Sequence, residues 1–207
     1  QVNIDIRDAP KKKVNAFLSL TRQISNTVDG RSDMPKIQEI IKVIKETSGQ
    51  VVIYSNYLQN GIKPMENALI DNQITYAKVT GEVSDDKIKQ AVNDYINEIV
   101  RVLLISSAGV ESLDLKCTSQ IHIMEPNWND PKINQVIGRA IRYKSHDRLP
   151  IDKRNVIIYK WISVFNTSFL TRLFNLFHKN KSADEVLVSI SLKKENEALW
   201  NGIAGGT

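Results

Sequence analysis

The hydrophobic residues of this chain form two kinds of pattern that alternate along the sequence. Short runs of β-branched and aliphatic residues predict strands over 51–55, 74–79, 102–105, 119–124 and 155–161. Between them, apolar residues at every third or fourth position predict helices after Asp33, over 62–71 and after Ser84. This alternation predicts an α/β fold with a mainly parallel sheet flanked by helices.

The predicted helices each have an apolar stripe that should face the sheet. The stripe of the helix after Asp33 consists of Ile37, Ile40, Ile41 and Ile44. The stripe of the helix after Ser84 consists of Ile88, Ala91, Val92, Tyr95, Ile96 and Ile99. At the two ends of the chain, 2–6 alternates like a strand and 10–26 reads as a helix. Residues 169–177 have helical spacing, and 186–192 alternates like a strand, although a capping box at Ser182 favours a helix.

A further predicted helix carries the most informative side chains. Asp130 is a suitable N-cap and Pro131 suits the first helical position. At about 100° per residue, one face gathers the polar Gln135, Arg139 and Arg142, and the other gathers Ile133, Val136, Ile137, Ala140 and Ile141. Two fixed guanidinium groups suit a phosphate chain, although an amphipathic helix with a solvated basic face has the same pattern. Gly138 costs a helix about 1 kcal/mol relative to alanine, so we expect something to approach it closely.

The composition is that of an ordinary globular protein. The 207 residues are 42% hydrophobic and 25% charged, with a net charge of +5 and a sequence pI of about 9.2, a mild bias toward polyanions. The single cysteine, Cys117, excludes an internal disulfide, fits a reducing compartment and is expected to be a buried thiol. We find no apolar run of the roughly 20 residues that span a bilayer and no signal peptide, and therefore expect no membrane partner. Both termini look like cuts from something longer.

Several segments resemble the motifs of superfamily 2 helicases and translocases, in the family's order. Residues 135–142, Gln-x-x-Gly-Arg-x-x-Arg, resemble the sixth motif. Residues 51–56 resemble the fourth motif, and residues 80–81 resemble the Thr-Gly motif that follows it. Residues 102–115 resemble the fifth motif, and residues 125–130 resemble the stretch before the sixth. Residues 139–150 are similar to helicase-like NTPases of large cytoplasmic DNA viruses. The resemblance covers 32–165 and implies a second RecA-like lobe there, an N-terminal strand and helix extension over 1–31 and a helical extension over 166–207.

The resemblance also implies roles for particular residues. Arg142 would be the arginine finger and Arg139 its γ-phosphate partner, although the two could be exchanged, and Gln135 would orient the phosphate or the attacking water. Gly109, Glu111 and Asp114 would face the nucleotide, with Asp114 near the ribose. Ser112 stands where glycine is usual, which puts the backbone there in doubt. Seven residues would contact the nucleic-acid backbone, all at or after predicted strand ends: Ser55, Asn56, Thr80, Gly81, Ser106, Ser107 and Ala108.

Simpler interpretations of the same residues remain open. The segments 80–81 and 106–108 are also what a strand needs in order to turn, and Asn56 could cap a strand end. Trp128 could line a cleft or lie buried between loops. The charged loop 143–155 is expected to be solvated. Its His146 has no second histidine or cysteine nearby in sequence, so we predict no metal site.

Two motifs of these motors have no counterpart in this sequence. It contains no Gly-x-x-x-x-Gly-Lys-Ser/Thr phosphate loop and no Asp-Glu-x-His or Asp-Glu-Ala-Asp run for magnesium. The resemblance therefore implies the second lobe alone, inactive by itself, with ATP and Mg²⁺ held mainly by an N-terminal RecA-like lobe. The expected partners are that lobe and single-stranded or duplex DNA or RNA, in an intracellular compartment such as a virion or viral factory. The alternative is a non-catalytic nucleic-acid- or partner-binding module, such as a transcription-factor subunit. An unrelated α/β nucleotide-binding domain is disfavoured because there is no glycine-rich fingerprint.

Overall fold

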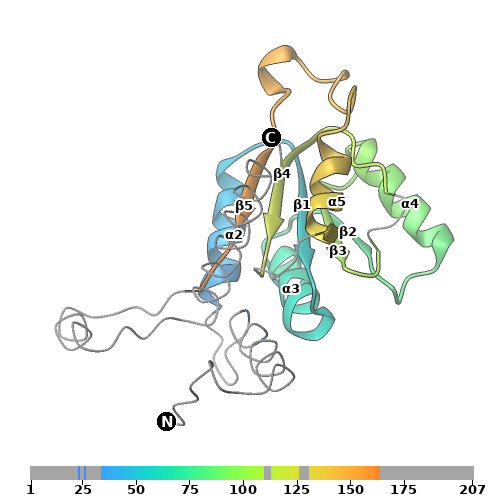
Figure 1. Ribbon diagram of the computed structural model, residues 1–207. Coiled ribbons are helices and arrows are strands. Elements are labelled where there is room, and N and C mark those ends of the chain that lie inside the picture. Colours follow the sequence, from blue (N-terminus) through green and yellow to red (C-terminus); the bar gives the residue numbers. More distant parts are fainter. Residues whose placement is uncertain (1–22, 24–25, 27–33, 110–112, 126–130, 164–207) are drawn as a thin grey trace, which may run out of the picture.

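The computed structural model describes residues 23, 26, 34–109, 113–125 and 131–163, and its centre is a parallel sheet (Figure 1). Its strands are β1 (Gln50–Ser55), β2 (Tyr76–Val79), β3 (Val102–Ser106), β4 (Thr118–Ile123) and β5 (Ile157–Lys160). They lie in the order β2-β3-β1-β4-β5, and every adjacent pair is parallel. The prediction of an α/β fold with a mainly parallel sheet is confirmed, and each strand lies within one residue of the predicted run or inside it.

Helices cover both faces of the sheet. Alternate residues of β1 point to opposite sides, so Val51 and Ile53 enter one core while Val52 and Tyr54 enter the other. The first core is completed by α2 (Pro35–Glu46) and α3 (Lys63–Asp71), and the second by α4 (Asp85–Ile96) and α5 (Pro131–Ala140). A π-helical turn, η1 (Leu58–Ile62), leads into α3, and a short 3₁₀ turn, η2 (Ile151–Lys153), precedes β5.

The helix predictions are right in place and partly wrong at the ends. The predicted stripe of α2 is buried along its whole length, but Met34 occupies the N-cap position in place of Asp33, which lies outside the described residues. Ser84 does precede α4, which buries Ala91 and Tyr95. That helix ends at Ile96, so Ile99 lies beyond it and is 63% exposed, contrary to the prediction.

Some sequence predictions fall outside the part of the chain that the structure describes. These are the strand at 2–6, the two patterns at 169–177 and 182–192, and the side chains of Asp130, Glu111, Ser112 and Trp128. Within the predicted helix 10–26, the two described residues, Gln23 and Asn26, are helical. The proposed boundaries at 31/32 and 165/166 stay predictions. Among the described helices, none has the length and apolar character needed to cross a bilayer.

Candidate functional site

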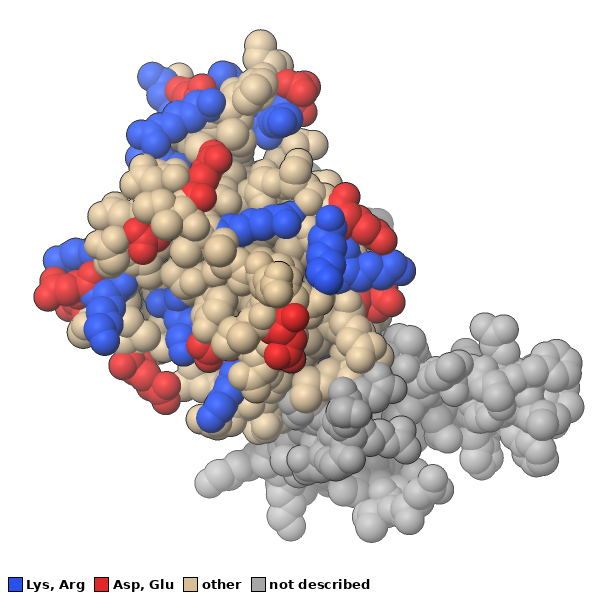
Figure 2. All heavy atoms as spheres, turned by 180° about the vertical axis from the view of Figure 1, so that it is seen from behind, with Lys and Arg blue, Asp and Glu red and all other residues tan. Residues whose placement is uncertain are grey.

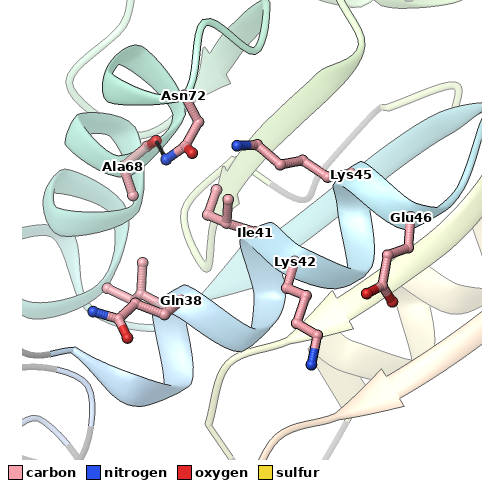
Figure 3. A pocket seen from close by; sticks show the side chains of 8 residues that line it. Gln38, Ile41, Lys42, Lys45, Glu46, Ala68 and Asn72 are labelled. Carbon is pink, nitrogen blue, oxygen red and sulfur yellow. Dashed lines mark hydrogen bonds between the residues drawn. The ribbon is translucent and has the colours of Figure 1, made fainter.

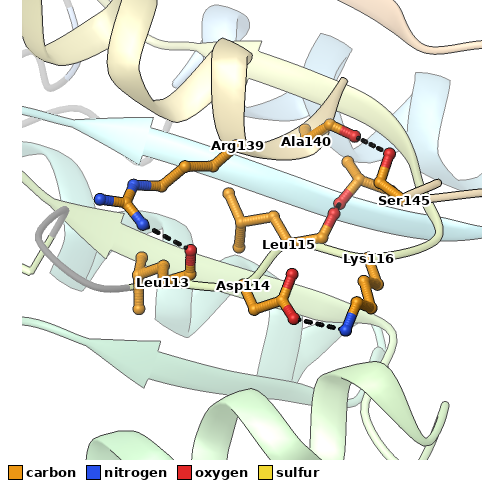
Figure 4. Close-up of polar contacts among 8 residues, drawn as sticks. Leu113, Asp114, Leu115, Lys116, Arg139, Ala140 and Ser145 are labelled. Atoms are coloured by element: carbon orange, nitrogen blue, oxygen red, sulfur yellow. Dashed lines mark hydrogen bonds and ion pairs between the residues drawn. The ribbon is translucent and has the colours of Figure 1, made fainter. Parts of the chain in front are cut away.

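Arg139 links α5 to the loop between β3 and β4. Its side chain is half-buried, and Nη1 donates a 2.9 Å hydrogen bond to the Leu113 carbonyl (Figure 4). Its Nε is buried without a hydrogen-bond partner among the described residues. Buried guanidinium N–H groups are normally satisfied, so we expect an acceptor for this one outside the described residues. Among the described residues the guanidinium bonds a neutral carbonyl and pairs with no carboxylate.

Arg142 does not lie on α5. The helix ends at Ala140, so the prediction of one helical face carrying Gln135, Arg139 and Arg142 is wrong for Arg142. The physical reason is that the Ser145 hydroxyl caps the Ala140 carbonyl at 2.8 Å and the chain then turns. For the same reason Ile141, predicted on the buried face, is 56% exposed. Gln135 and Arg142 are both exposed.

Asp114, the predicted ribose contact, pairs with Lys116 in this structure. The Asp114 Oδ2 and Lys116 Nζ atoms are 2.7 Å apart, and both side chains are more than two-fifths exposed (Figure 4). Exposed ion pairs contribute at most about 1 kcal/mol, so a ligand hydroxyl could displace the lysine. Because Arg139 bonds the neighbouring Leu113, the arginine and this carboxylate belong to one connected surface.

Gly109 has a structural reason to be glycine. It is buried, and a Cβ atom there would collide with the Val79 carbonyl at the end of β2. Its backbone nitrogen donates to the Ser106 carbonyl at 3.0 Å, which closes the turn after β3. The prediction that Gly109 faces a nucleotide is therefore at odds with its burial, since close packing of β2 against this turn accounts for it.

The residues predicted to contact nucleic acid are divided by burial. Gly81 and Ala108 are exposed and adjacent, because a Cβ on Gly81 would lie 3.0 Å from that of Ala108. Ser106 is buried, and its hydroxyl has no partner among the described residues. Thr80 is also buried. The loops after β2 and β3 are thus brought together, because these parallel strands are adjacent and end at the same edge of the sheet.

The remaining predicted contacts lie in the β1 loop. Ser55 is fully buried, and its hydroxyl donates to Glu125 Oε1 at 2.7 Å, so its side chain does not face a nucleic-acid strand as predicted. Asn56 is half-buried; its Oδ1 accepts from the Tyr54 hydroxyl at 2.9 Å and its Nδ2 has no described partner. Ser107 is half-buried.

Sequence reasoning missed a buried polar cluster around Glu125, at the carboxyl end of β4. This carboxylate also accepts from the Asn56 backbone at 3.0 Å and from the Asn26 side chain. Lys36 is buried beside it and donates to Asn26 Oδ1 at 3.2 Å and to the Met124 carbonyl at 3.1 Å. Burial raises the pKa of the Glu125 carboxyl above its ordinary value. The only sequence signal was a glutamate directly after a buried strand.

The arginines and the strand-end loops lie toward opposite edges of the sheet. Ser55 and Ser106 end their strands at one edge. The residues after α5 bond to the beginning of β4, since the Ser145 carbonyl accepts from the Cys117 nitrogen at 2.9 Å. The two sets of residues are separated because α5 returns the chain to the start of β4 (Figure 1).

Gly138 is open to solvent. An added Cβ would have nothing within 4 Å, so the close approach predicted from this glycine is absent within the described residues.

Cys117 is a buried free thiol, as predicted, and burial raises its pKa. The loop 143–155 is mostly exposed, as predicted, except for Ser145, which is buried, and His146 and Leu149, which are half-buried.

Other hollows and charges do not mark an alternative site. A groove of about 460 Å³ lies between α2 and α3, with Ile41 and Lys45 on its walls, and it includes none of the predicted site residues (Figure 3). A hollow of about 190 Å³ at the end of β2 is lined by Thr80 and Lys63. Basic and acidic side chains are interspersed on the face seen in Figure 2. Among the described residues, no group of three His, Cys, Asp or Glu side chains could hold a metal ion.

Comparisons with known proteins agree with this arrangement. Residues 35–144 match the family described as "Helicase conserved C-terminal domain". The chain is 48% identical over 199 residues to "Putative ATP-dependent RNA helicase L538" of Acanthamoeba polyphaga mimivirus, a match that covers 96% of this chain and 42% of that protein. It is 30% identical over 161 residues to "Termination factor NPH-I homolog" of African swine fever virus (isolate Tick/South Africa/Pretoriuskop Pr4/1996), covering 74% of this chain and 22% of that protein. The chain thus spans less than half the length of these curated relatives.

Solved structures support the fold. The C-terminal part of the Fun30 ATPase domain superposes with a TM-score of 0.54 at 17% identity, covering 84% of this chain and 59% of that one. The C-terminal domain of the DEAD-box protein Dbp5 superposes with a TM-score of 0.52 at 12% identity, covering 76% and 91%.

Proposed function

Because this chain belongs to the family of helicase conserved C-terminal domains, we propose that it is the second motor lobe of an ATP-dependent nucleic-acid helicase or translocase. In this proposal a first lobe holds ATP and Mg²⁺, and this lobe completes the site with cationic side chains. The chain alone lacks the phosphate loop and would not hydrolyse ATP.

The observation that carries the proposal is the state of Arg139. Its guanidinium is oriented by the Leu113 carbonyl, pairs with no carboxylate of the described residues and keeps a buried Nε without a described partner. A guanidinium that is oriented without being paired to a carboxylate suits a phosphate anion held by another lobe. Asp114, on the same connected surface, supplies a carboxylate of the kind that binds a ribose hydroxyl.

Arg142 is the proposed arginine finger. It is exposed next to α5, so a second lobe closing on this face could bring a triphosphate to it. Bound ATP would supply the phosphoryl group, and Arg142 would stabilise the negative charge that develops on it. Such a residue raises turnover by about 10³-fold or more, equivalent to roughly 4 kcal/mol of barrier. Gln135, exposed one turn before Arg139, would orient the phosphate or the attacking water.

The proposed nucleic-acid contacts lie at the edge where β2 and β3 end. Gly81 and Ala108 are adjacent and exposed, and their backbone N–H groups suit phosphate oxygens. Further polar side chains lie in or beside the same loops and would add contacts after small side-chain rearrangements: Thr80, Ser106, Ser107 and the Asn56 amide. Since such contacts hold the backbone without reading bases, they fit DNA and RNA alike. The relative from Acanthamoeba polyphaga mimivirus is named as an RNA helicase, which makes RNA the first substrate to test.

The test is nucleic-acid-stimulated ATPase activity of the complete two-lobe protein. We expect Arg142→Ala to lower kcat by about 10³-fold. Lys153→Ala is the matched control, because it removes an exposed positive charge from the following loop without touching the proposed site. Arg139→Ala is measured in parallel, since the two arginines could exchange roles.

Three results are informative. A large loss with Arg142→Ala and none with Lys153→Ala supports the finger. A large loss only with Arg139→Ala moves the finger role to that residue. Unchanged turnover in both arginine variants refutes the motor-lobe proposal and leaves a non-catalytic nucleic-acid- or partner-binding module.

A further inference from the structure

The chain leaves α5 through a tight turn that contains Arg142. The Arg142 carbonyl accepts a hydrogen bond from the Ser145 nitrogen at 2.9 Å, which closes the turn 142–145. Within it, Lys144 has φ 63°, a left-handed conformation that is unfavourable for residues other than glycine. Such a turn persists only when surrounding interactions hold it.

Ser145 supplies several of those interactions. It is buried, and its hydroxyl donates to the Ala140 carbonyl at 2.8 Å, which ends α5. Its carbonyl accepts from the Cys117 nitrogen at 2.9 Å, which ties the turn to the residue before β4. One residue therefore fixes both the end of the helix and the position of the turn that follows it.

His146 adds a second attachment to β4. Its Nε2 lies 2.7 Å from the Thr118 carbonyl, and because a carbonyl oxygen only accepts, Nε2 is the donor. Its Nδ1 lies 2.8 Å from the Ser145 hydroxyl. The Thr118 hydroxyl is itself bonded to the buried Tyr95 hydroxyl at 2.9 Å and donates to the Leu115 carbonyl at 3.0 Å. The turn is thus anchored to the core and to the loop that carries Asp114.

Arg142 has no comparable attachment of its own. Its side chain is exposed and forms no hydrogen bond or ion pair with another residue of the described ranges. The direction in which it leaves the lobe is therefore set by its backbone, and the backbone is set by Ser145 and His146.

We propose that Ser145 and His146 are positioning residues for the arginine finger, an inference that rests on the proposed function. They hold the turn so that the Arg142 guanidinium projects from a defined point next to the Asp114 loop. Neither side chain needs to touch ATP. A displacement of about 1 Å in a reacting arrangement can cost about 10²-fold in rate, so loosening this turn should lower turnover without changing substrate binding.

The experiment is a double-mutant cycle on ATPase activity in the complete protein at saturating nucleic acid. His146→Phe keeps a planar ring but removes both ring nitrogens, and we expect kcat to fall by about 10²-fold with KM for ATP unchanged. His146→Gln keeps an amide N–H that can reach the Thr118 carbonyl, and we expect it to retain most of the activity. In an Arg142→Ala background, His146→Phe should cause no further loss, because the residue that it positions is already gone.

The outcomes separate this inference from the proposed function. Equal losses from His146→Phe in both backgrounds, or a rise in KM in place of a fall in kcat, overturn the positioning role. An Arg142→Ala variant with normal turnover overturns the finger itself. Folding of each variant is checked by thermal melting. If His146→Phe does not fold, Ser145→Ala takes its place in the same cycle, since it removes only the hydroxyl that caps α5, and additive losses would again overturn the inference.

Discussion

Replacing Gly138 with alanine should make this chain more stable and the complete protein less active. The glycine lies inside α5, and a Cβ there meets nothing within 4 Å. Alanine is better than glycine in a helix by up to about 1 kcal/mol, and no clash opposes that gain. For a chain of this size, 1 kcal/mol corresponds to a rise in Tm of about 2–4 °C.

The assay combines thermal unfolding of the 207-residue chain with ATPase activity of the complete protein. Gly138 lies one residue before Arg139 on an exposed face, so a first lobe that closes there would meet the added methyl group. We expect turnover to fall by about tenfold or more, as a small displacement of the arginines would cause. Gly109→Ala is the matched control, because its Cβ would collide with the Val79 carbonyl and lower the Tm of the chain.

Two results would contradict this reasoning. If Gly138→Ala raises the Tm and leaves ATPase activity unchanged, no partner approaches α5 closely at this position and activity does not require a glycine there. If the Tm falls, the helix around Gly138 is not as open in solution as the structure describes.

The remaining predictions concern stability and use denaturant unfolding of this chain. Arg101, just before β3, donates to the Ile44 and Thr47 carbonyls at the end of α2. Arg101→Ala should lower the free energy of unfolding by about 2 kcal/mol, and Arg101→Lys should lower it by less. Equal losses in the two variants would show that the guanidinium geometry is irrelevant. Burial lowers the pKa of His122 from 6.5 to about 4. Because the unfolded chain binds this proton more readily, stability should be fully present above pH 6.5 and fall by up to about 3 kcal/mol as the pH drops to 4. A His122→Phe variant should lose that part of the pH dependence, and a slope identical to that of the original chain would contradict the assignment.

The sequence by itself determined the architecture. Hydrophobic periodicity is a local property, and the Ile37 to Ile44 stripe of α2 and the runs that form β1 and β3 are buried as expected. Parallel pairing followed from the alternation of strands and helices, because parallel strands need a crossover between them. The motif residues were identified through their resemblance to the motifs of superfamily 2 helicases, which occur here in the family's order.

Only the tertiary structure decided how those residues are presented. Asn26 and Glu125 are 99 residues apart in sequence yet share a hydrogen bond, and Ser55 is buried in the same cluster. His146 and Thr118 are 28 residues apart, and their contact helps to place Arg142 in a turn beyond α5. Periodicity reports which face of an element is apolar. It carries no information about long-range hydrogen bonds between side chains and backbone, and these bonds end α5 at Ala140 and separate the arginines from the strand-end loops.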